Sequence, residues 1–467
     1  MQTSNPSPPG DLLAPEQPSR KPGRLRHWLG LDRAIAFTVL ARAWSSAAGL
    51  VTVALIARFL TGTEQGYFYT INSLVALQII FELGFSFVIL QMASHERAHL
   101  TVDPLGNISG DRVAHARLAS VLQKAIRWYA LAALLFLVVL LPAGMHFFST
   151  HQRPGVQVAY VMPWLAAVVA AAINLQVNPV LSFFEGWGDV APVARSRFFQ
   201  ALAGSSLAWA ALATHHGLYA PALTILGQAL AGLVWIGSRR KTLLQLLKHQ
   251  PGEHRIPWMK EVWSFQWRIA LSWIAGYFIF QIFTPVLFAY SGPVAAGQMG
   301  MSLNIVGALS AVALSWINTK AAPFGTMISR REFAKLDQVF FRALYQSLAV
   351  CAAGGLAIWI ACLFLNTTGS PFASRMLAPF AFGLLLLSAV INHVWYSEAI
   401  YIRAHKQEKY LGVSVGIAIL VSLTAFVLGK HFGSMGMAAG YLAVSVVVGF
   451  GFGTPIFLKY RRLWHAD

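Results

Sequence analysis

Charged residues are scarce in this chain of 467 residues. They make up 11% of it, against about 25% in an average soluble domain, while 57% of the residues are hydrophobic. This composition excludes an ordinary soluble domain and is typical of a membrane protein. The few charges are also unbalanced, since 17 acidic residues stand against 35 lysines and arginines and leave a net charge of +18.

Cysteine is nearly absent, and so are two common motifs. Cys351 and Cys362 fall in one predicted helix, where a rise of about 1.5 Å per residue separates them by about 16 Å, too far for a disulfide. The chain has no G-x-x-x-x-G-K-[ST] loop, so nothing in it indicates an ATPase. Residues 1–23 lack the basic-then-apolar order of a cleavable signal peptide, and we expect the first membrane helix to act as an uncleaved insertion signal.

Long apolar stretches are abundant. Each is long enough to cross the hydrocarbon core of a bilayer, which takes about 20 residues of helix. The sequence predicts twelve such membrane helices, at 34–59, 66–91, 125–148, 158–184, 192–213, 218–238, 264–290, 296–318, 339–365, 376–402, 410–429 and 435–458.

Lysine and arginine gather in alternate connections between these stretches. Short cytoplasmic loops retain such residues, so the pattern predicts that both termini are cytoplasmic. The opposite, outer side holds only Arg58, Arg153, Arg375 and Lys430. The net charge is therefore a sign of topology. Anionic lipid of the cytoplasmic leaflet is the expected partner, and nucleic acid is not.

The chain divides near its middle. We expect a cytoplasmic tail at 1–33, a first lobe at 34–238, a basic linker at 239–263, a second lobe at 264–458 and a cytoplasmic tail at 459–467. Each half begins with a helix that contains an arginine, followed by a glycine-containing outer turn, at 62–66 and at 292–297. Parallel repeats are one way in which transporters are built. The sequence thus predicts an all-α membrane protein of two pseudo-symmetric six-helix lobes around a central cavity.

Arginines inside the predicted helices are candidate ligand-binding residues. Arg42 lies well inside the first helix, where an arginine costs about 2.5–3.5 kcal/mol on insertion scales. That cost is tolerated if the side chain faces an anion in a cavity or forms a structural ion pair, for which Glu82 is the candidate partner. Arg268, near the start of the seventh helix, could likewise face an anion or form an ion pair, and its side chain could also extend to the cytoplasmic surface of the membrane. Arg58 is a further candidate, or an anchor at the interface.

Other polar and aromatic residues accompany these arginines. Glu82 and Glu398 lie within predicted helices, where an acid is a candidate for a coupling ion or an ion pair. Trp44 and Trp273 stand close to the arginines in sequence. Aromatic rings and guanidinium groups together suit a sugar diphosphate, although an interfacial aromatic belt would give a similar pattern.

One motif points to an enzyme. His95, Glu96 and His99 spell H-E-x-x-H, which on a helix can bind zinc through both histidines while the glutamate acts as general base. The string falls where the second membrane helix runs out, and no third ligand stands out in the sequence. We therefore predict the end of a helix here and no metal or cofactor. A membrane glycosyltransferase or polymerase is also disfavoured, because Glu64 is the only acid in the predicted outer loops.

Residues 40–94 resemble the start of the polysaccharide flippases. The shared features are Arg42, the run A-R-F-L-x-G-x-x-x-G-Y at 57–67, and Glu82-Leu83-Gly84 in the second helix. These flippases belong to the superfamily of multidrug, oligosaccharidyl-lipid and polysaccharide exporters. The resemblance implies two lobes, alternating access, and cationic residues in a cavity that receive a lipid diphosphate. It carries that role to Arg42 and Arg268.

The sequence therefore predicts a flippase of the bacterial inner membrane. It would carry undecaprenyl-diphosphate-linked oligosaccharide for O-antigen or exopolysaccharide synthesis, without acting as an enzyme. A polysaccharide polymerase or chain-length regulator is a candidate partner. Two alternatives stay open: a cation-coupled multidrug exporter of the same superfamily, and a membrane-embedded zinc protease that uses residues 95–99.

Overall fold

The computed structural model describes residues 33–102, 108–152, 157–250, 252, 256–257, 262–405 and 407–466. The tail predicted at 1–33 therefore lies, except for Arg33, outside the described residues, and the linker predicted at 239–263 is described in part.

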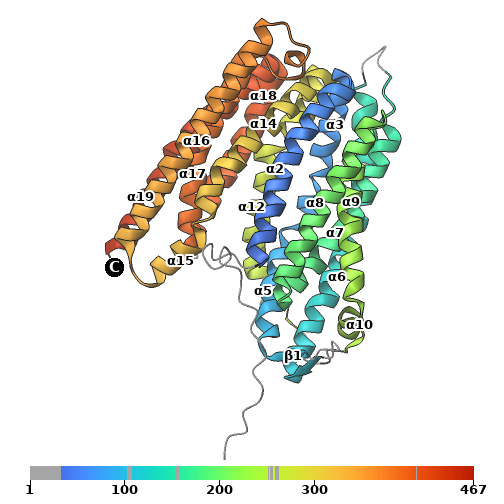
Figure 1. The fold of residues 1–467 in the computed structure, drawn as a ribbon, viewed down its shortest axis with the longest axis vertical. Coiled ribbons are helices and arrows are strands. Elements are labelled where there is room, and N and C mark those ends of the chain that lie inside the picture. The colour runs from blue at the N-terminus through green and yellow to red at the C-terminus, as the bar shows by residue number, and fades with distance from the viewer. Residues whose placement is uncertain are drawn as a thin grey trace, which may run out of the picture.

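Every predicted membrane stretch is mainly helical (Figure 1). The first half contains α2 (Arg33–Phe59), α3 (Gly62–Val75), α4 (Gln78–Glu82), α5 (Phe85–Arg97), α6 (Arg112–Thr150), α7 (Val161–Trp187), α8 (Val190–Ala213), η1 (Gly217–Tyr219), α9 (Ala220–Ser238) and α10 (Arg240–Lys248). The second half contains α12 (Trp263–Phe280), α13 (Phe283–Ser291), α14 (Pro293–Asn318), α15 (Ala321–Ser329), α16 (Phe333–Thr367), η2 (Ala373–Arg375), α17 (Pro379–Ala404), α18 (Leu411–Val444), η3 (Ser445–Gly453) and α19 (Thr454–Ala466). The only strands in the described part are β1 (Leu100–Val102) and β2 (Ile108–Gly110), a short antiparallel hairpin.

Nine helices of the described chain are long and apolar enough to cross a membrane, or ten if the bent pair 62–82 and 85–97 is one span. Two further crossings, which this criterion of length and apolar character does not count separately, bring the number to the twelve predicted. α8 is helical throughout but carries Arg195, Arg197 and Gln200 in its first half, which makes it more polar. The segment 411–465 counts as one helix, but it turns at Gly433, where φ is 57° and ψ is −141°.

The turn at Gly433 folds this long segment back on itself. A Cβ atom added at Gly440 would lie 2.9 Å from the Cβ of Thr424, so the stretches before and after the turn run side by side. Glycine adopts the required positive φ without the steric cost that other residues have. The last two predicted crossings are therefore an α-hairpin with almost no loop.

The helices form two lobes with the same internal packing. In the first lobe α2 packs on α8, α5 on α6 and α7, and α7 on α6 and α9. In the second lobe α12 packs on α18, α14 on α16 and α17, and α17 on α16, α18 and η3. The packing in the second lobe repeats the packing in the first, six crossings later in the chain, as expected of a parallel duplication.

The lobes meet at one end of the molecule and separate at the other. At the closed end, formed by residues 60–66, 292–298 and 371–377, α3 packs on α13 and α14, and α2 touches α14. At the opposite end, Figure 1 shows α15, α16 and α19 well apart from α5, α6 and α10. Near that end the described lobes are linked mainly by α12, which touches α4 and α5.

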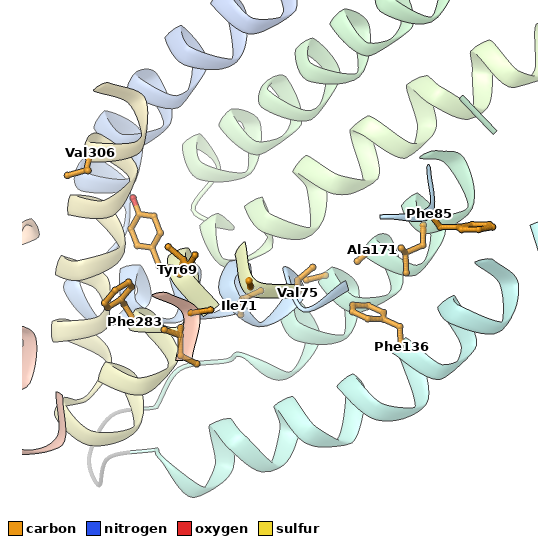
Figure 2. Close-up of a cluster of buried hydrophobic side chains, with 14 of the residues drawn as sticks. Tyr69, Ile71, Val75, Phe85, Phe136, Ala171, Phe283 and Val306 are labelled. Carbon is orange, nitrogen blue, oxygen red and sulfur yellow. The ribbon is translucent and has the colours of Figure 1, made fainter. Parts of the chain in front are cut away.

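A buried apolar cluster joins the lobes from within. Figure 2 shows Tyr69, Ile71 and Val75 of α3 between Phe283 and Val306 on one side and Phe85, Phe136 and Ala171 on the other. All are buried, from 0% to 8% exposed. α3 therefore belongs to the core of its own lobe and also forms the contact with the other lobe.

Candidate functional site

The second membrane helix is broken at the residues that carry the family resemblance. Leu83 and Gly84 have φ values of 53° and 64°, and the helices on either side are bent by 43°. A non-glycine residue in this left-handed region costs about 1–2 kcal/mol. The Leu83 carbonyl, freed from the helix, accepts a hydrogen bond from Nε2 of Gln266 on α12. The break therefore forms a contact between the two lobes.

Glycines at the closed end allow the lobes to approach. A Cβ atom added at Gly66 would lie 1.9 Å from the Pro293 carbonyl oxygen, and one added at Gly297 would lie 2.9 Å from the backbone nitrogen of Gly66. Nε2 of Gln65 donates to the carbonyl oxygens of Gly297 and Arg375, both at 2.9 Å. Close backbone contacts thus hold the first lobe against the second, and they leave no room for a side chain at these glycines.

The prediction that these glycines mark turns was partly wrong. Gly292, with a φ of 89°, does lie in a turn. Gly66 and Gly297 lie inside α3 and α14, and a turn does not require them. Their function is close helix approach, where glycine is favoured because backbones can come together.

Arg42 and Arg268 occupy corresponding helices of the two lobes, the first crossing of each. Both side chains are exposed. Arg268 lies over the ring of Trp267, 5.4 Å from its centroid. In the part of the chain that the structure describes, neither arginine has a carboxylate partner. The structural ion pair of Arg42 with Glu82 is therefore absent from this arrangement.

The acids near the open end are paired with other basic residues. The ion pairs are Glu96–Arg117 at 2.7 Å, Glu185–Arg197 at 2.7 Å, Asp189–Arg239 at 3.0 Å, Asp337–Arg461 at 2.5 Å and Glu408–Arg403 at 3.1 Å. Burial raises the pKa of Asp189, and the charges of Arg239 and Arg97 act against that rise. These pairs leave Arg42 and Arg268 as cations available to a ligand.

Glu82 and Glu398 are held by hydroxyl groups. Glu82, at the helix break, accepts a hydrogen bond from Ser86 at 2.7 Å and a longer one from Tyr129 at 3.4 Å. Glu398 on α17 is 3% exposed and accepts from Tyr410 at 3.0 Å and Thr454 at 3.1 Å. Neither has a basic partner among the described residues. Glu398 is buried and Glu82 is half-buried. A carboxylate removed from water without a cation is costly to ionise, so both acids are suited to bind a proton or a metal cation.

The two tryptophans differ in what they can offer a ligand. Nε1 of Trp44 donates to Ser205 at 3.1 Å, and the ring lies 5.9 Å from that of Trp209, so Trp44 serves mainly the packing of α2 on α8. Trp273 is 40% exposed and lies over Gly84 at the helix break. Of the two, Trp273 is the better placed to contact a sugar.

Arg58 lies apart from Arg42, at the closed end. It lines a cavity of 620 Å³ together with Arg375, an association that the sequence analysis did not predict. The two residues come from different lobes. Their separation along the chain hid this association, because it depends entirely on how the lobes pack.

The H-E-x-x-H residues lie at the end of α5, with His99 just beyond its last residue, Arg97. Glu96 is 6% exposed, and its Oε1 is 2.7 Å from Nε of Arg117 on α6. Among the described residues, no third ligand joins His95 and His99 into a metal site. The carboxylate is engaged by a cation and is not directed at water between two histidines, so the geometry favours a structural ion pair.

Glu96→Gln should therefore affect stability and not transport. Loss of a part-buried, charge-assisted hydrogen bond costs about 1–3 kcal/mol, and we expect a lower midpoint of thermal unfolding with an unchanged export rate per molecule. Adding Arg117→Gln should recover part of the loss. Stoichiometric zinc that disappears in His95→Ala would contradict this interpretation.

Comparison with known proteins adds a family and a fold. Residues 31–329 match the model of a family described as polysaccharide biosynthesis protein. No curated protein matches the chain. An inward-facing multidrug resistance MATE transporter of the MOP superfamily is similar in structure, with a TM-score of 0.64 and 14% identity over 91% of this chain and 99% of the other.

Two further solved structures share the fold. The outward-facing conformation of a multidrug resistance MATE transporter gives a TM-score of 0.53 at 14% identity, over 95% of this chain and 99% of the other. The lipid II flippase MurJ in an inward closed conformation gives 0.51 at 14% identity, over 92% and 90%. At these identities the likeness establishes the fold alone, which is an all-α, multi-pass membrane fold of two lobes.

Proposed function

This chain belongs to the polysaccharide biosynthesis protein family, and we propose that it moves a lipid-linked oligosaccharide across the bacterial inner membrane. Its fold, which it shares with a lipid II flippase, supports this proposal. The carrier lipid is undecaprenyl diphosphate, and the direction is from the cytoplasmic to the periplasmic leaflet. Transport proceeds by alternating access without covalent chemistry. The product enters O-antigen or exopolysaccharide assembly, where a polymerase or chain-length regulator is the expected partner.

The observation that carries this proposal is the pair of cations on α2 and α12. Arg42 and Arg268 are exposed and without carboxylate partners in the described chain. A desolvated diphosphate needs charge-assisted hydrogen bonds, and the planar guanidinium group is suited to provide them. A cavity for cationic drugs would instead favour acids over arginines, so Arg42 and Arg268 argue against a drug exporter.

Export is tested in a strain that lacks the gene. The wild-type chain should restore surface polysaccharide and clear the lipid-linked oligosaccharide that accumulates in its absence. The same strain is challenged with cationic drugs. Restored drug resistance without restored polysaccharide would favour the multidrug exporter and refute the flippase.

Glu82 and Glu398 are the proposed coupling sites, one in each lobe. Glu82→Gln and Glu398→Gln keep the hydrogen-bonding shape but remove the titratable proton. If either acid couples transport to an ion, the variant should bind the lipid normally and transport it more slowly, by about 10-fold or more, since coupling contributes about 1–3 kcal/mol. An unchanged rate in both variants would contradict the assignment.

Orientation follows from the basic residues near the open end. We propose that this end is cytoplasmic, with anionic lipids around it, and that both termini are cytoplasmic. A reporter fused after Asp467 should therefore be active only in its cytoplasmic form. A fusion in the outer turn near Ser291 should give the opposite result. A periplasmic C-terminus would overturn the orientation.

A further inference from the structure

The cavity at the closed end has the charge of an anion site. Its walls come from α2 and the start of α3 in the first lobe and from α14 and the η2 segment in the second. The lining includes Arg58 and Arg375 and contains no acid. Glu64, the nearest acid in sequence, accepts hydrogen bonds from the backbone nitrogen and hydroxyl of Thr61, at 2.8 and 2.9 Å, and so caps its own helix.

Arg375 has hydrogen-bonding capacity that the protein does not use. Its Nη1 atom is buried and has no acceptor among the described residues. A buried donor without an acceptor costs about 1–3 kcal/mol, and more for a charged group. The Arg375 backbone is nevertheless firmly held, since Gln65 donates to its carbonyl oxygen at 2.9 Å and Gln298 donates to that of Ser374 at 3.0 Å. Contacts from both lobes therefore hold the backbone of Arg375 at the cavity that this residue lines.

Two helix ends add to the positive potential. Gly62 and Val294, in the first turns of α3 and α14, both line the cavity. The N-terminal end of a helix carries about half a positive charge and favours anions. Ala54, Ala57 and Phe372 add an apolar wall, and Gln298 and Ser374 add uncharged polar groups. A cationic head region beside apolar walls, on the seam between α2 and α14, suits a lipid with a phosphate group.

We propose that Arg58 and Arg375 form a binding site for the phosphate group of a lipid at the closed end of this seam. Where the flippase function proposed above holds, the site receives the diphosphate of the carried lipid on the side of release. The same chemistry would also accept the headgroup of an anionic phospholipid. Because the arginines come from opposite lobes, a bound phosphate favours the closed arrangement of this end by its greater affinity for it.

Native mass spectrometry of the full chain in detergent tests the site with three lipids. The probes are undecaprenyl diphosphate, phosphatidylglycerol and, as a control without a phosphate group, diacylglycerol. We expect each of Arg58→Ala and Arg375→Ala to weaken binding of a phosphate lipid about 10-fold, as the loss of one charge-assisted hydrogen bond would, and the double variant to lose the site. Diacylglycerol binding should not change.

Two further variants separate charge from structure. Ala54→Phe fills the cavity while both arginines remain, and it should also weaken binding. Lys430→Ala removes another cation at this end, one that lies over Tyr290 outside the cavity, and should bind as the wild type does. Thermal unfolding of every variant is measured in parallel to show that it is folded.

The outcomes identify the source of the phosphate. Loss of undecaprenyl diphosphate alone assigns the site to the carried lipid, and loss of phosphatidylglycerol alone assigns it to a membrane phospholipid. A folded double variant that binds both lipids as the wild type does overturns the proposal. Failure of the flippase function is distinct, since it would appear as surface polysaccharide that the wild-type chain does not restore in the strain lacking the gene, and it would leave phosphatidylglycerol binding at Arg58 and Arg375 unaffected.

Discussion

Gly66→Leu should abolish transport by preventing closure of the lobes at the closed end of the molecule, where α3 packs on α14. Even a Cβ atom at this position would lie 1.9 Å from the Pro293 carbonyl oxygen, a contact that backbone atoms cannot avoid without separating α3 from α14. Alternating access requires both closed arrangements. We expect less than about 1% of wild-type export, because a separation that costs more than about 3 kcal/mol leaves the closed state under 1% populated.

A cysteine pair reports the closure directly. Gly62→Cys and Val294→Cys introduce thiols at positions whose side chains are close, since a Cβ atom at Gly62 would lie 3.9 Å from Cγ1 of Val294. The native cysteines, Cys351 and Cys362, are buried and are replaced by alanine. Oxidation should crosslink the pair in the wild-type background and much less with Gly66→Leu.

A matched glycine provides the control. Gly237, on α9, is exposed and has no atom within 4 Å of an added Cβ, so Gly237→Leu should leave export and crosslinking unchanged. Normal export by Gly66→Leu together with undiminished crosslinking would show that the α3–α14 contact is not required for transport.

Arg42→Ala should strongly reduce export without lowering the amount of protein. A charge-assisted hydrogen bond to a diphosphate contributes about 1.5–3 kcal/mol, which corresponds to about 10- to 150-fold in affinity. Arg42→Lys keeps the charge but loses the planar fork, so we expect partial export. Surface polysaccharide and protein abundance are measured together.

The absence of an Arg42–Glu82 pair sharpens this test. If the arginine were structural, Arg42→Ala would reduce abundance and the addition of Glu82→Ala would restore it. The structure holds Glu82 through Ser86 and Tyr129, so we expect no rescue. Arg112→Ala, which removes another exposed arginine at the start of α6, is the control and should export normally. Normal export and abundance in Arg42→Ala would refute the cavity assignment.

The broken second helix shows how far local sequence reaches. The residues Glu82-Leu83-Gly84 supported the family resemblance, yet the sequence predicted an unbroken helix at 66–91. A single glycine inside an apolar run costs only about 1 kcal/mol, which does not by itself indicate a break. The break is stabilised by Gln266 and by the packing of Trp273 over Gly84, and both come from the other lobe.

The sequence by itself determined the class of the protein, the positions of its membrane helices and the arginines on the first helix of each half. These features are local, because the thickness of the hydrocarbon core and the cost of moving a charge into it act on each segment separately. The remaining features depend on the tertiary structure. They are the reversal of the chain at Gly433, the backbone contact at Gly66, the ion pairs of the acids with other cations, and the cavity that Arg58 and Arg375 line together. Contacts between lobes depend on which faces of similar apolar helices come together, and hydrophobicity alone does not distinguish those faces because lipid and protein interior are equally apolar.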